Sequence, residues 1–196
     1  MGSGRRGRRV RAVSRRWEVL LEQVARERYQ RLVAHATLVS ASPSDAQDLV
    51  QESLIAAFSG RARFGSVEQA EAYVRRAIAS RAIDAGRRRT REARLLARAA
   101  AQTPGVVVQD DRLPGADVVR ALAALSPRER ACVVLRQMED LSVAETASAL
   151  GLSEGAVKRY TSDGLTRLNA QLGTTTDTGE RIAVRTLNPT EVRHER

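Results

Sequence analysis

Residues 142–168, with the sequence SVAETASALGLSEGAVKRYTSDGLTRL, constrain the fold of this chain more than any other segment. A helix-turn-helix needs a small residue in its first helix, a glycine at the turn and inward-facing apolar residues in its second helix. Ala147 supplies the small residue, Gly151 can end the first helix in a left-handed conformation, and Ser153 can cap the second. The apolar positions that complete the pattern are Leu150, Leu152, Val157 and Tyr160. The segment therefore predicts a helix-turn-helix.

The exposed side of the second predicted helix is polar. The N-terminal end of such a recognition helix enters the major groove of DNA, where side chains read base edges. Glu154 can accept a hydrogen bond from cytosine, and Lys158 or Arg159 can donate to guanine or to phosphate. Each residue fits a solvated helix surface equally well, so DNA binding rests on the whole motif. The candidate DNA contacts on this helix are Ser153, Glu154, Lys158, Arg159, Thr161 and Ser162.

The composition of the 196-residue chain favours a helical protein with a polyanionic partner. Hydrophobic residues make up 42% of the sequence, which is enough for packed cores, and aromatic residues only 3%. Ala, Leu, Arg and Glu recur throughout, and these residues lose little entropy on entering a helix. The net charge is +10, and Lys158 is the only lysine, so the positive charge is almost all arginine. Nucleic acid is the commonest partner of such a chain, although a solvated charged surface would have the same composition.

The segment 44–58, SDAQDLVQESLIAAF, is the clearest amphipathic helix of the chain. Asp45, Asp48 and Glu52 line its outer face without a basic residue among them, which predicts a docking surface separate from the DNA contacts. The alternative is that these carboxylates only favour the helix N-terminus, and Glu52 fits that alternative poorly. The predicted buried stripe is Ala46, Leu49, Val50, Ser53, Leu54 and Ala57.

An arginine-rich region follows this helix. A loop at residues 60–65 holds Arg61, Arg63 and Phe64, and a further helix is predicted from about Val67 to Arg89. Arginine forms planar bidentate hydrogen bonds with phosphate, so the basic face of this helix predicts phosphate contacts. The apolar positions of the helix are Ala70, Tyr73, Val74, Ala77 and Ile78, and its basic positions are Arg75, Arg76, Arg81, Arg87, Arg88 and Arg89.

Shifts in composition divide the chain into five parts. Residues 1–16 carry seven arginines and no acidic residue, which predicts a disordered basic arm. Residues 17–92 begin with a helical period at Trp17 and contain both helices described above. Residues 93–116 include two Pro-Gly pairs and predict a flexible linker. Residues 117–172 contain a short helix, a capping box that begins at Ser126 and the helix-turn-helix, and residues 173–196 show no sustained period.

Few residues of the chain are suited to catalysis or metal binding. His35 and His194 are the only histidines and Cys132 the only cysteine, so we expect neither a metal site nor a nucleophile–base pair. Cys132 lies among apolar neighbours and is expected in a core, and His35 is expected to be partly buried structure. No apolar run approaches the roughly 20 residues that span a bilayer. We therefore expect a cytoplasmic protein that is not an enzyme, needs no cofactor and does not insert into a membrane.

Two blocks of the sequence resemble the sigma-70 family of bacterial transcription initiation factors. DAQDLVQESLIAAF, followed by a short loop and AYVRRAIASRAIDAGRRR, looks like the core region of that family, named region 2. LSPRERACVVLRQMEDLSVAETASALGLSEGAVKRY resembles its C-terminal region, region 4. The length, without a further domain between the blocks, resembles the extracytoplasmic-function (ECF) subfamily. The expected fold is all-α, with two small helical domains joined by a flexible linker, the second a helix-turn-helix (winged-helix-like) DNA-binding domain.

The resemblance implies partners and residue roles. The chain would bind core RNA polymerase, direct it to specific promoter DNA and assist melting, and an anti-sigma factor would restrain it. Asp45, Asp48, Gln51 and Glu52 would dock on the basic coiled-coil clamp helices of the largest polymerase subunit. The recognition helix at 153–163, with Arg128, would read the minus-thirty-five element. The residues that would recognise and melt the minus-ten element are Arg61, Arg63, Phe64, Tyr73, Arg76, Ser80, Arg81, Asp84, Arg87 and Arg88.

The chain departs from the family pattern at several positions. Many ECF members carry Trp at the place of Tyr73 and Asn at the place of Ser80, so Ser80 is not expected to read a base as that Asn can. The recognition helix carries Asp163 and Gly164 where relatives often have basic and small residues. We expect weaker phosphate contacts from the second half of this helix and an unusual promoter preference. In the linker, Asp110 and Asp111 would lie near the polymerase interior.

Two other functions are consistent with parts of the sequence. A stand-alone helix-turn-helix regulator would use residues 17–92 as a sensor or dimerisation domain, but neither a ligand pocket nor a self-association face is evident. A basic architectural protein would explain the charge and leave the helix-turn-helix and the acidic face without a use. The sigma-like interpretation accounts for both features.

Overall fold

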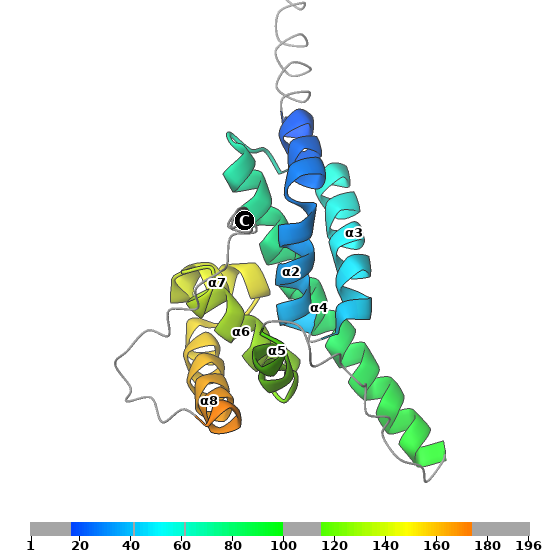
Figure 1. The fold of residues 1–196 in the computed structure, drawn as a ribbon, viewed down its shortest axis with the longest axis vertical. Helices are drawn as coiled ribbons and strands as arrows, with labels where there is room; N and C mark the ends of the chain where they lie inside the picture. The colour runs from blue at the N-terminus through cyan, green and yellow to red at the C-terminus, as the bar shows by residue number, and fades with distance from the viewer. Residues whose placement is uncertain (1–16, 41, 61, 100–114, 174–196) are drawn as a thin grey trace, which may run out of the picture.

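The computed structural model describes residues 17–40, 42–60, 62–99 and 115–173, and this part of the chain is helical without a β-strand (Figure 1). The all-α prediction is therefore confirmed, and no β-wing accompanies the helix-turn-helix within these ranges. A helical segment at residues 17–27 precedes seven labelled helices. These are α2 (Tyr29–Ser40), α3 (Pro43–Ser59), α4 (Val67–Ala99), α5 (Ala116–Ala123), α6 (Pro127–Gln137), α7 (Val143–Leu150) and α8 (Glu154–Leu172).

The N-terminal bundle consists of residues 17–27, α2, α3 and the first half of α4. Ser42 begins α3 by accepting a hydrogen bond from the backbone of Asp45, and Pro43 stands in the first turn, where its missing N–H costs nothing. All six positions of the predicted stripe of α3 are buried. They pack against α2 and α4, whose own buried residues include Leu32, Ala36, Val74 and Ile78. The helical periodicity of the sequence therefore predicted the buried residues of α3 correctly.

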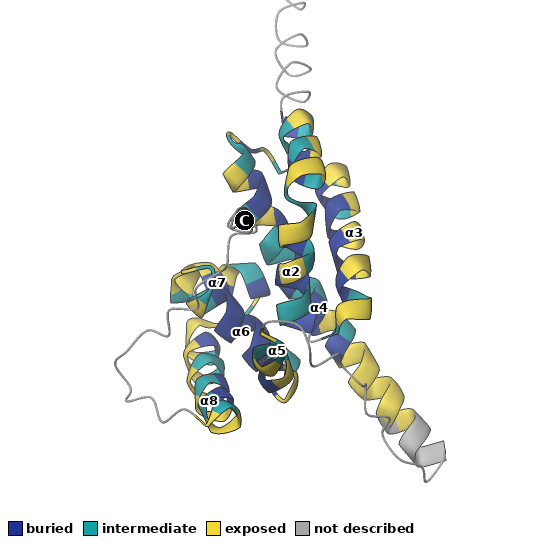
Figure 2. Cartoon of the chain, in the orientation of Figure 1, coloured by how far each residue is buried: buried dark blue, intermediate teal, exposed yellow. Residues whose placement is uncertain are grey.

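Helix α4 is longer than predicted. It ends at Ala99 rather than near Arg89, so residues 93–99, which we assigned to the linker, are helical. The reason is local, because the segment REARLLARA contains only good helix formers and no Gly or Pro. The described side chains beyond Arg89 are exposed, and this end of the helix projects away from the rest of the molecule (Figure 2). The remaining linker residues, 100–114, lie outside the described ranges.

The C-terminal bundle consists of α5, α6, α7 and α8. Ser126 and Glu129 form the predicted capping box of α6, and Ser142 and Glu145 form a second one at α7. Helix α8 crosses close to α6 at Gly164, where an added Cβ atom would lie 2.7 Å from Cγ2 of Val133. The glycine that we interpreted as a departure affecting DNA contacts therefore has a packing role.

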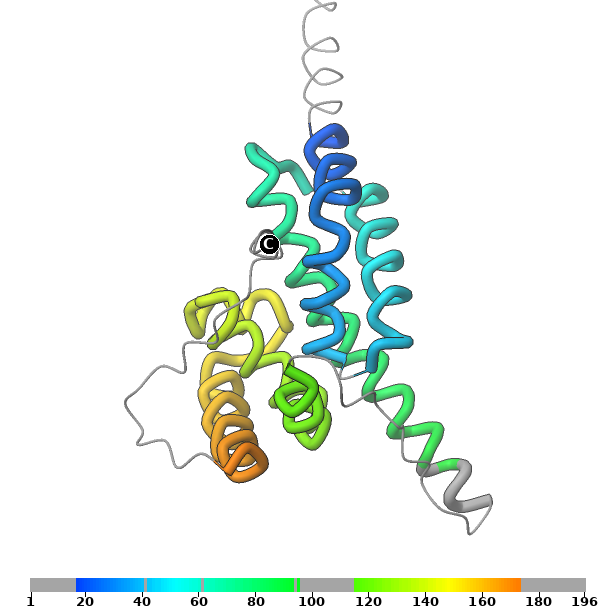
Figure 3. The backbone as a smooth tube through the Cα atoms, viewed as in Figure 1, coloured from blue at the N-terminus to red at the C-terminus, as the bar shows by residue number. Residues whose placement is uncertain are grey.

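The two bundles are packed against each other. Helix α6 contacts both α2 and α4, and α7 contacts α4. Figure 3 shows the C-terminal bundle lying along one side of α2 and α4. Gly86 of α4 is buried at this junction, because a Cβ atom there would lie 2.4 Å from Cγ of Pro127 in α6. The sequence contained no sign of this contact.

Candidate nucleic-acid interface

Helices α7 and α8 form the predicted helix-turn-helix. Gly151 ends α7 with φ 61°, the left-handed conformation that favours glycine, and its N–H bonds to the carbonyl of Ala147. Ser153 caps α8 by accepting a hydrogen bond from the N–H of Ala156 at 3.2 Å. Val157 is fully buried and Ala147 nearly so, as a close crossing of the two helices requires.

The outer face of α8 presents the predicted DNA-reading residues. Ser153, Glu154, Lys158, Arg159 and Ser162 are exposed, whereas Thr161 is half-buried. The guanidinium of Arg159 lies 5.1 Å from the ring centroid of Tyr160. Arg128 of α6 donates a hydrogen bond to the Tyr160 hydroxyl at 3.1 Å, which places it beside the recognition helix. This hydrogen bond is the main reason why the pKa of Tyr160 is lowered.

A cleft of about 990 Å³ lies between α4 and the C-terminal bundle. We call it the arginine cleft, because Arg81, Arg87, Arg88 and Arg91 enter it from α4 and Arg128 enters it from α6. The other residues that line it are Glu52, Ser80, Asp84, Thr90, Ser126, Pro127 and Tyr160. The structure thus brings five of the predicted minus-ten residues and the predicted minus-thirty-five residue Arg128 to one cavity.

Arg63, Phe64 and Tyr73 of the predicted minus-ten set lie elsewhere, in the loop that precedes α4 and in the second turn of that helix. The ring centroids of Phe64 and Tyr73 are 5.1 Å apart, and Phe64 makes an edge contact with Trp17 at 6.4 Å. Arg63 lies over the Trp17 ring at 4.9 Å. Phe64 is only 9% exposed and Tyr73 is 36% exposed, so Tyr73 and not Phe64 offers a free aromatic face. We had placed Tyr73 among the apolar packing positions of α4, and that assignment was wrong.

The other members of the predicted minus-ten set differ in accessibility. Arg76 is half-buried, and its Nε atom donates to the carbonyl of Ala72 at 3.0 Å. Arg61 lies outside the described residues. The arm at 1–16, the acidic pair Asp110 and Asp111 and the tail beyond Gly173 also lie outside them.

The predicted acidic face of α3 contains apolar residues as well. Asp48, Gln51 and Glu52 are exposed, but Asp45 forms an ion pair with Arg89 of α4. Ile55 is 65% exposed and Phe58 39% exposed, one turn beyond the acidic residues. The sequence analysis missed both, although Ile55 lies four and three residues after Gln51 and Glu52, and Phe58 lies three residues after Ile55, which puts all of them on the same face. We call Asp48, Gln51, Glu52, Ile55 and Phe58 the α3 face.

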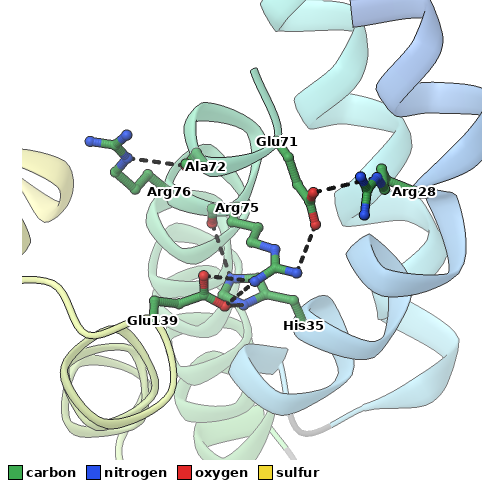
Figure 4. Close-up of polar contacts among 7 residues, drawn as sticks. All are labelled: Arg28, His35, Glu71, Ala72, Arg75, Arg76 and Glu139. Carbon is green, nitrogen blue, oxygen red and sulfur yellow. Dashed lines mark hydrogen bonds and ion pairs between the residues drawn. The ribbon is translucent and has the colours of Figure 1, made fainter. Parts of the chain in front are cut away.

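A partly buried charged network joins the two bundles (Figure 4). Arg75 of α4 donates to Glu71 at 2.8 Å and to both carboxylate oxygens of Glu139, in the turn after α6, at 2.7 Å. Nδ1 of His35 lies 3.1 Å from the Glu139 carboxylate, and Nε2 lies 3.1 Å from the carbonyl of Arg75. His35 is 4% exposed, so it is a structural residue as expected, and the network itself was not predicted.

The network shifts the pKa values of Glu139 and Arg75. Burial alone would raise the pKa of Glu139, but the hydrogen bond to His35 and the charges of His35 and Arg75 outweigh it and lower the pKa. For Arg75, burial is again opposed by Glu139 and Glu71, and the net effect is a raised pKa. Both shifts favour the charged forms, so the pair is ionised around neutral pH.

The described residues give little support for a metal site, a reactive cysteine or a membrane-spanning helix. No group of three or more His, Cys, Asp or Glu side chains there could hold a metal ion. Cys132 is buried, and burial raises the pKa of its thiol to about 11, which fits the predicted core position. Among the same residues, no helix combines the length and the apolar character that crossing a membrane demands.

Comparison with known protein families accounts for the order of the two helical bundles along the chain. Residues 24–92 match the family described as Sigma-70 region 2, and residues 116–168 match Sigma-70, region 4. These are the two blocks of the predicted resemblance, in the same order. The first block contains α2, α3 and most of α4, and the second contains α5, α6, α7 and most of α8.

Individual relatives agree with the family match. The chain is 34% identical over 159 residues to the RNA polymerase sigma-E factor of Streptomyces avermitilis, an alignment that covers 79% of this chain and 87% of the relative. It is 30% identical over 156 residues to the ECF RNA polymerase sigma factor SigM of Mycobacterium tuberculosis, covering 78% and 76% of the two chains. These proteins are similar over both bundles.

A solved structure shows the same fold. The sigma factor RpoE of Bartonella quintana, crystallised in complex with the anti-sigma factor NepR, superposes with a TM-score of 0.59 at 22% identity, covering 83% of this chain and 97% of that one. Together with the matched regions and the relatives, this fold leads to one assignment. The chain belongs to the sigma-70 family and, within it, to the ECF sigma factors.

Proposed function

We propose that this sigma factor binds core RNA polymerase, directs it to promoters with two separate elements and helps to open the DNA. The observation that carries this proposal is the occurrence of region 2 and a complete helix-turn-helix in one chain. The protein acts by binding and positioning and has no enzymatic activity of its own. Its place of action is the cytoplasm, where polymerase and chromosome meet.

The α3 face is the proposed docking surface for polymerase. Its acidic and amide groups complement a basic coiled coil, and Ile55 and Phe58 add an apolar centre that can be buried on association. Asp45 has a supporting role, because its pairing with Arg89 connects α3 to α4. The surface therefore combines charge for steering with apolar area for affinity.

Two sets of residues are proposed to contact promoter DNA. The minus-ten set on α4 and its preceding loop comprises Arg63, Tyr73, Arg76, Ser80, Arg81, Asp84, Arg87 and Arg88. Tyr73 is suited to stack on an unpaired base, and the arginines are suited to contact phosphates. The minus-thirty-five set comprises Arg128, Ser153, Glu154, Lys158, Arg159, Thr161 and Ser162. Ser153 and Glu154 lie at the capped start of α8, the end that enters the groove.

An anti-sigma factor is a further proposed partner. ECF sigma factors are usually restrained in this way, and the α3 face is charged, exposed and therefore available to such a protein. Purification of tagged protein from native cells should recover polymerase and one additional small protein. Repeated recovery of polymerase alone would argue against this partner.

Run-off transcription with purified core polymerase tests the proposed function. A pool of promoter fragments is transcribed with the wild-type protein, with Lys158→Ala and without a sigma factor. The expected result is a set of protein-dependent start sites that share two spaced elements, with Lys158→Ala altering the upstream one. If the protein binds duplex DNA by itself and adds no specificity to polymerase, the stand-alone regulator becomes the better description.

A further inference from the structure

The arginine cleft carries more positive charge than its own carboxylates balance. Its lining contains five arginines but only two carboxylates, those of Glu52 and Asp84. Three positive charges of the lining are therefore left without a counter-charge. Because like charges that face one cavity repel each other and attract counter-ions, the cleft favours an anion from solution.

Two of the five arginines, Arg81 of α4 and Arg128 of α6, are half-buried. Among the described residues, Arg81 has no hydrogen-bond or ion-pair partner, and the hydrogen bond from Arg128 goes to the neutral hydroxyl of Tyr160. Arg75, which is half-buried as well, is by contrast paired with Glu139. A half-buried cation loses part of its hydration, so a bound anion would compensate for the carboxylate that Arg81 and Arg128 lack.

The arginines of α4 form a row along the helix. Arg88 follows Arg81 by seven residues and Arg91 follows Arg88 by three, which places the three side chains on one face. At a rise of about 1.5 Å per residue, the row is about 15 Å long. Arg87 lies beside it, and Asp84 interrupts it between Arg81 and Arg88. A ligand that follows this row therefore carries several negative charges along its length, because a single phosphate would reach only part of it.

Neutral donors line the cleft together with the arginines. The Tyr160 hydroxyl accepts the hydrogen bond from Arg128, so its own hydrogen stays free to donate. That hydrogen bond also lowers the pKa of Tyr160, which makes the hydroxyl a stronger donor. Ser80 is half-buried and has no hydrogen-bond partner in the described part of the chain. An oxyanion in the cleft would thus meet hydroxyl groups as well as guanidinium groups.

The size and the chemistry of the cleft select the class of ligand. Its volume of about 990 Å³ is that of a small-molecule site, and a duplex, whose major groove alone is about 12 Å wide, does not fit into it. The apolar groups of the lining are Pro127 and the ring of Tyr160, which gives little area for a large apolar body. Guanidinium groups match phosphate by planar bidentate hydrogen bonding. The best match is a chain of several phosphate groups.

We propose that the arginine cleft binds a free oligophosphate anion, either inorganic or the phosphate chain of a nucleotide. Arg81 and Arg128 hold it from the two sides of the cleft, and the exposed Arg87, Arg88 and Arg91 extend the site along α4. Arg81, Arg87 and Arg88 also belong to the minus-ten set, so the anion and promoter DNA compete for them. This competition rests on the proposed function, whereas binding of the anion does not.

Isothermal titration calorimetry of the full-length protein tests the site. Sodium triphosphate, ATP and orthophosphate are titrated in metal-free buffer at constant ionic strength, because screening alters the binding of any anion to a basic protein. Triphosphate should bind at one site per chain, with a Kd at least about ten-fold lower than that of orthophosphate, since it engages several arginines. Arg81→Gln and Arg128→Gln should each raise this Kd about ten-fold, because each removes charge-assisted hydrogen bonds.

Arg31→Gln is the matched control, since it removes the same charge from an exposed position of α2 that does not line the cleft. It should leave the Kd of triphosphate unchanged, and circular dichroism should show wild-type helix content for all three variants. Triphosphate should also raise the Tm of the wild type more than that of Arg81→Gln, because a ligand that binds only the folded state stabilises it.

The proposal is overturned if no saturable binding of triphosphate occurs, if orthophosphate binds as tightly, or if Arg31→Gln weakens binding as much as the two cleft variants do. Equal or weaker binding of ATP identifies the phosphate chain itself as the ligand, and tighter binding identifies a nucleotide. No polymerase or DNA is present, so the result is independent of the run-off assay. A protein that directs transcription but binds no triphosphate contradicts only this inference, and the reverse result contradicts only the proposed function.

Discussion

Nη1 of Arg75 lies 2.7 Å from both carboxylate oxygens of Glu139, and this contact joins two residues that are 64 positions apart in the chain. Arg75 belongs to α4 of region 2, and Glu139 belongs to the turn that follows α6 in region 4. Both side chains are largely shielded from solvent, with 24% and 15% exposure. The ion pair is therefore far less screened than one on the surface.

Replacement of Glu139 by glutamine should destabilise the protein. The substitution leaves the Arg75 guanidinium with Glu71 as its remaining carboxylate partner, and breaking one side of a partly buried pair costs about 1–3 kcal/mol. Chemical denaturation should show a lower midpoint for Glu139→Gln. Asp140→Asn is the matched control, because Asp140 is exposed and asparagine tolerates its positive φ of 50°. Equal effects of the two variants would contradict the assigned role.

The contribution of Glu139 should depend on pH in a defined direction. Its pKa in the folded protein is lowered from 4.5, so its stabilising effect is complete above that value and is lost as the pH falls through the lowered pKa. The difference in unfolding free energy between wild type and Glu139→Gln should therefore shrink as the pH is lowered below about 4.5. A difference that grew on acidification would have the wrong sign.

Gly164→Ala should disturb the packing of α8 on α6. The added methyl group would lie 2.7 Å from Val133, and overpacking of this kind costs about 1–3 kcal/mol although alanine favours helix. Thermal unfolding followed by circular dichroism should show a lower Tm. Gly155→Ala in the same helix meets no described atom and should be neutral or slightly stabilising. An unchanged Tm for Gly164→Ala would show that the helices can shift apart freely.

Ile55→Ala should weaken binding to core polymerase without affecting the fold. Ile55 is 65% exposed, so its truncation leaves the interior intact. If the α3 face is buried against polymerase, the lost apolar area corresponds to about 1–2 kcal/mol, or about ten-fold in Kd. Val19→Ala removes a similarly exposed aliphatic side chain in residues 17–27 and is the control. Identical Kd values for both variants in a fluorescence titration would remove Ile55 from the docking surface.

Lys158→Ala and Arg88→Ala should affect DNA binding in different ways. Lys158 projects from the recognition helix, so its loss should relax the preference at one upstream base pair, at a cost of about 1–3 kcal/mol. Arg88 is an exposed residue of α4 suited to phosphate, so its loss should weaken binding to all sequences and reduce the salt dependence. Holoenzyme titrations on a matched and a mutated promoter at two salt concentrations distinguish the two patterns. Sequence-independent weakening by Lys158→Ala would reassign it as a phosphate contact.

Local signals in the sequence were sufficient for most of the helices. The stripe of α3, the capping box at Ser126 and the turn at Gly151 were all predicted and are all present, because each depends on residues within about four positions of one another. The end of α4 was misplaced because the change in composition at residue 93 was interpreted as a boundary, whereas Leu95 and its neighbours still favour helix.

The sequence by itself determined that this chain forms helices with a buried side, that it contains a helix-turn-helix and that it resembles ECF sigma factors. Periodicity, capping and motif spacing are local properties, and they survive in any arrangement of the two bundles. Only the tertiary structure decided that Phe64 is buried while Tyr73 is accessible, that Asp45 is paired with Arg89, and that Gly86 meets Pro127. These contacts join residues that are far apart in the chain, or they depend on which neighbouring side chain shields an aromatic ring from solvent. No local sequence pattern encodes the close approach of two helix surfaces.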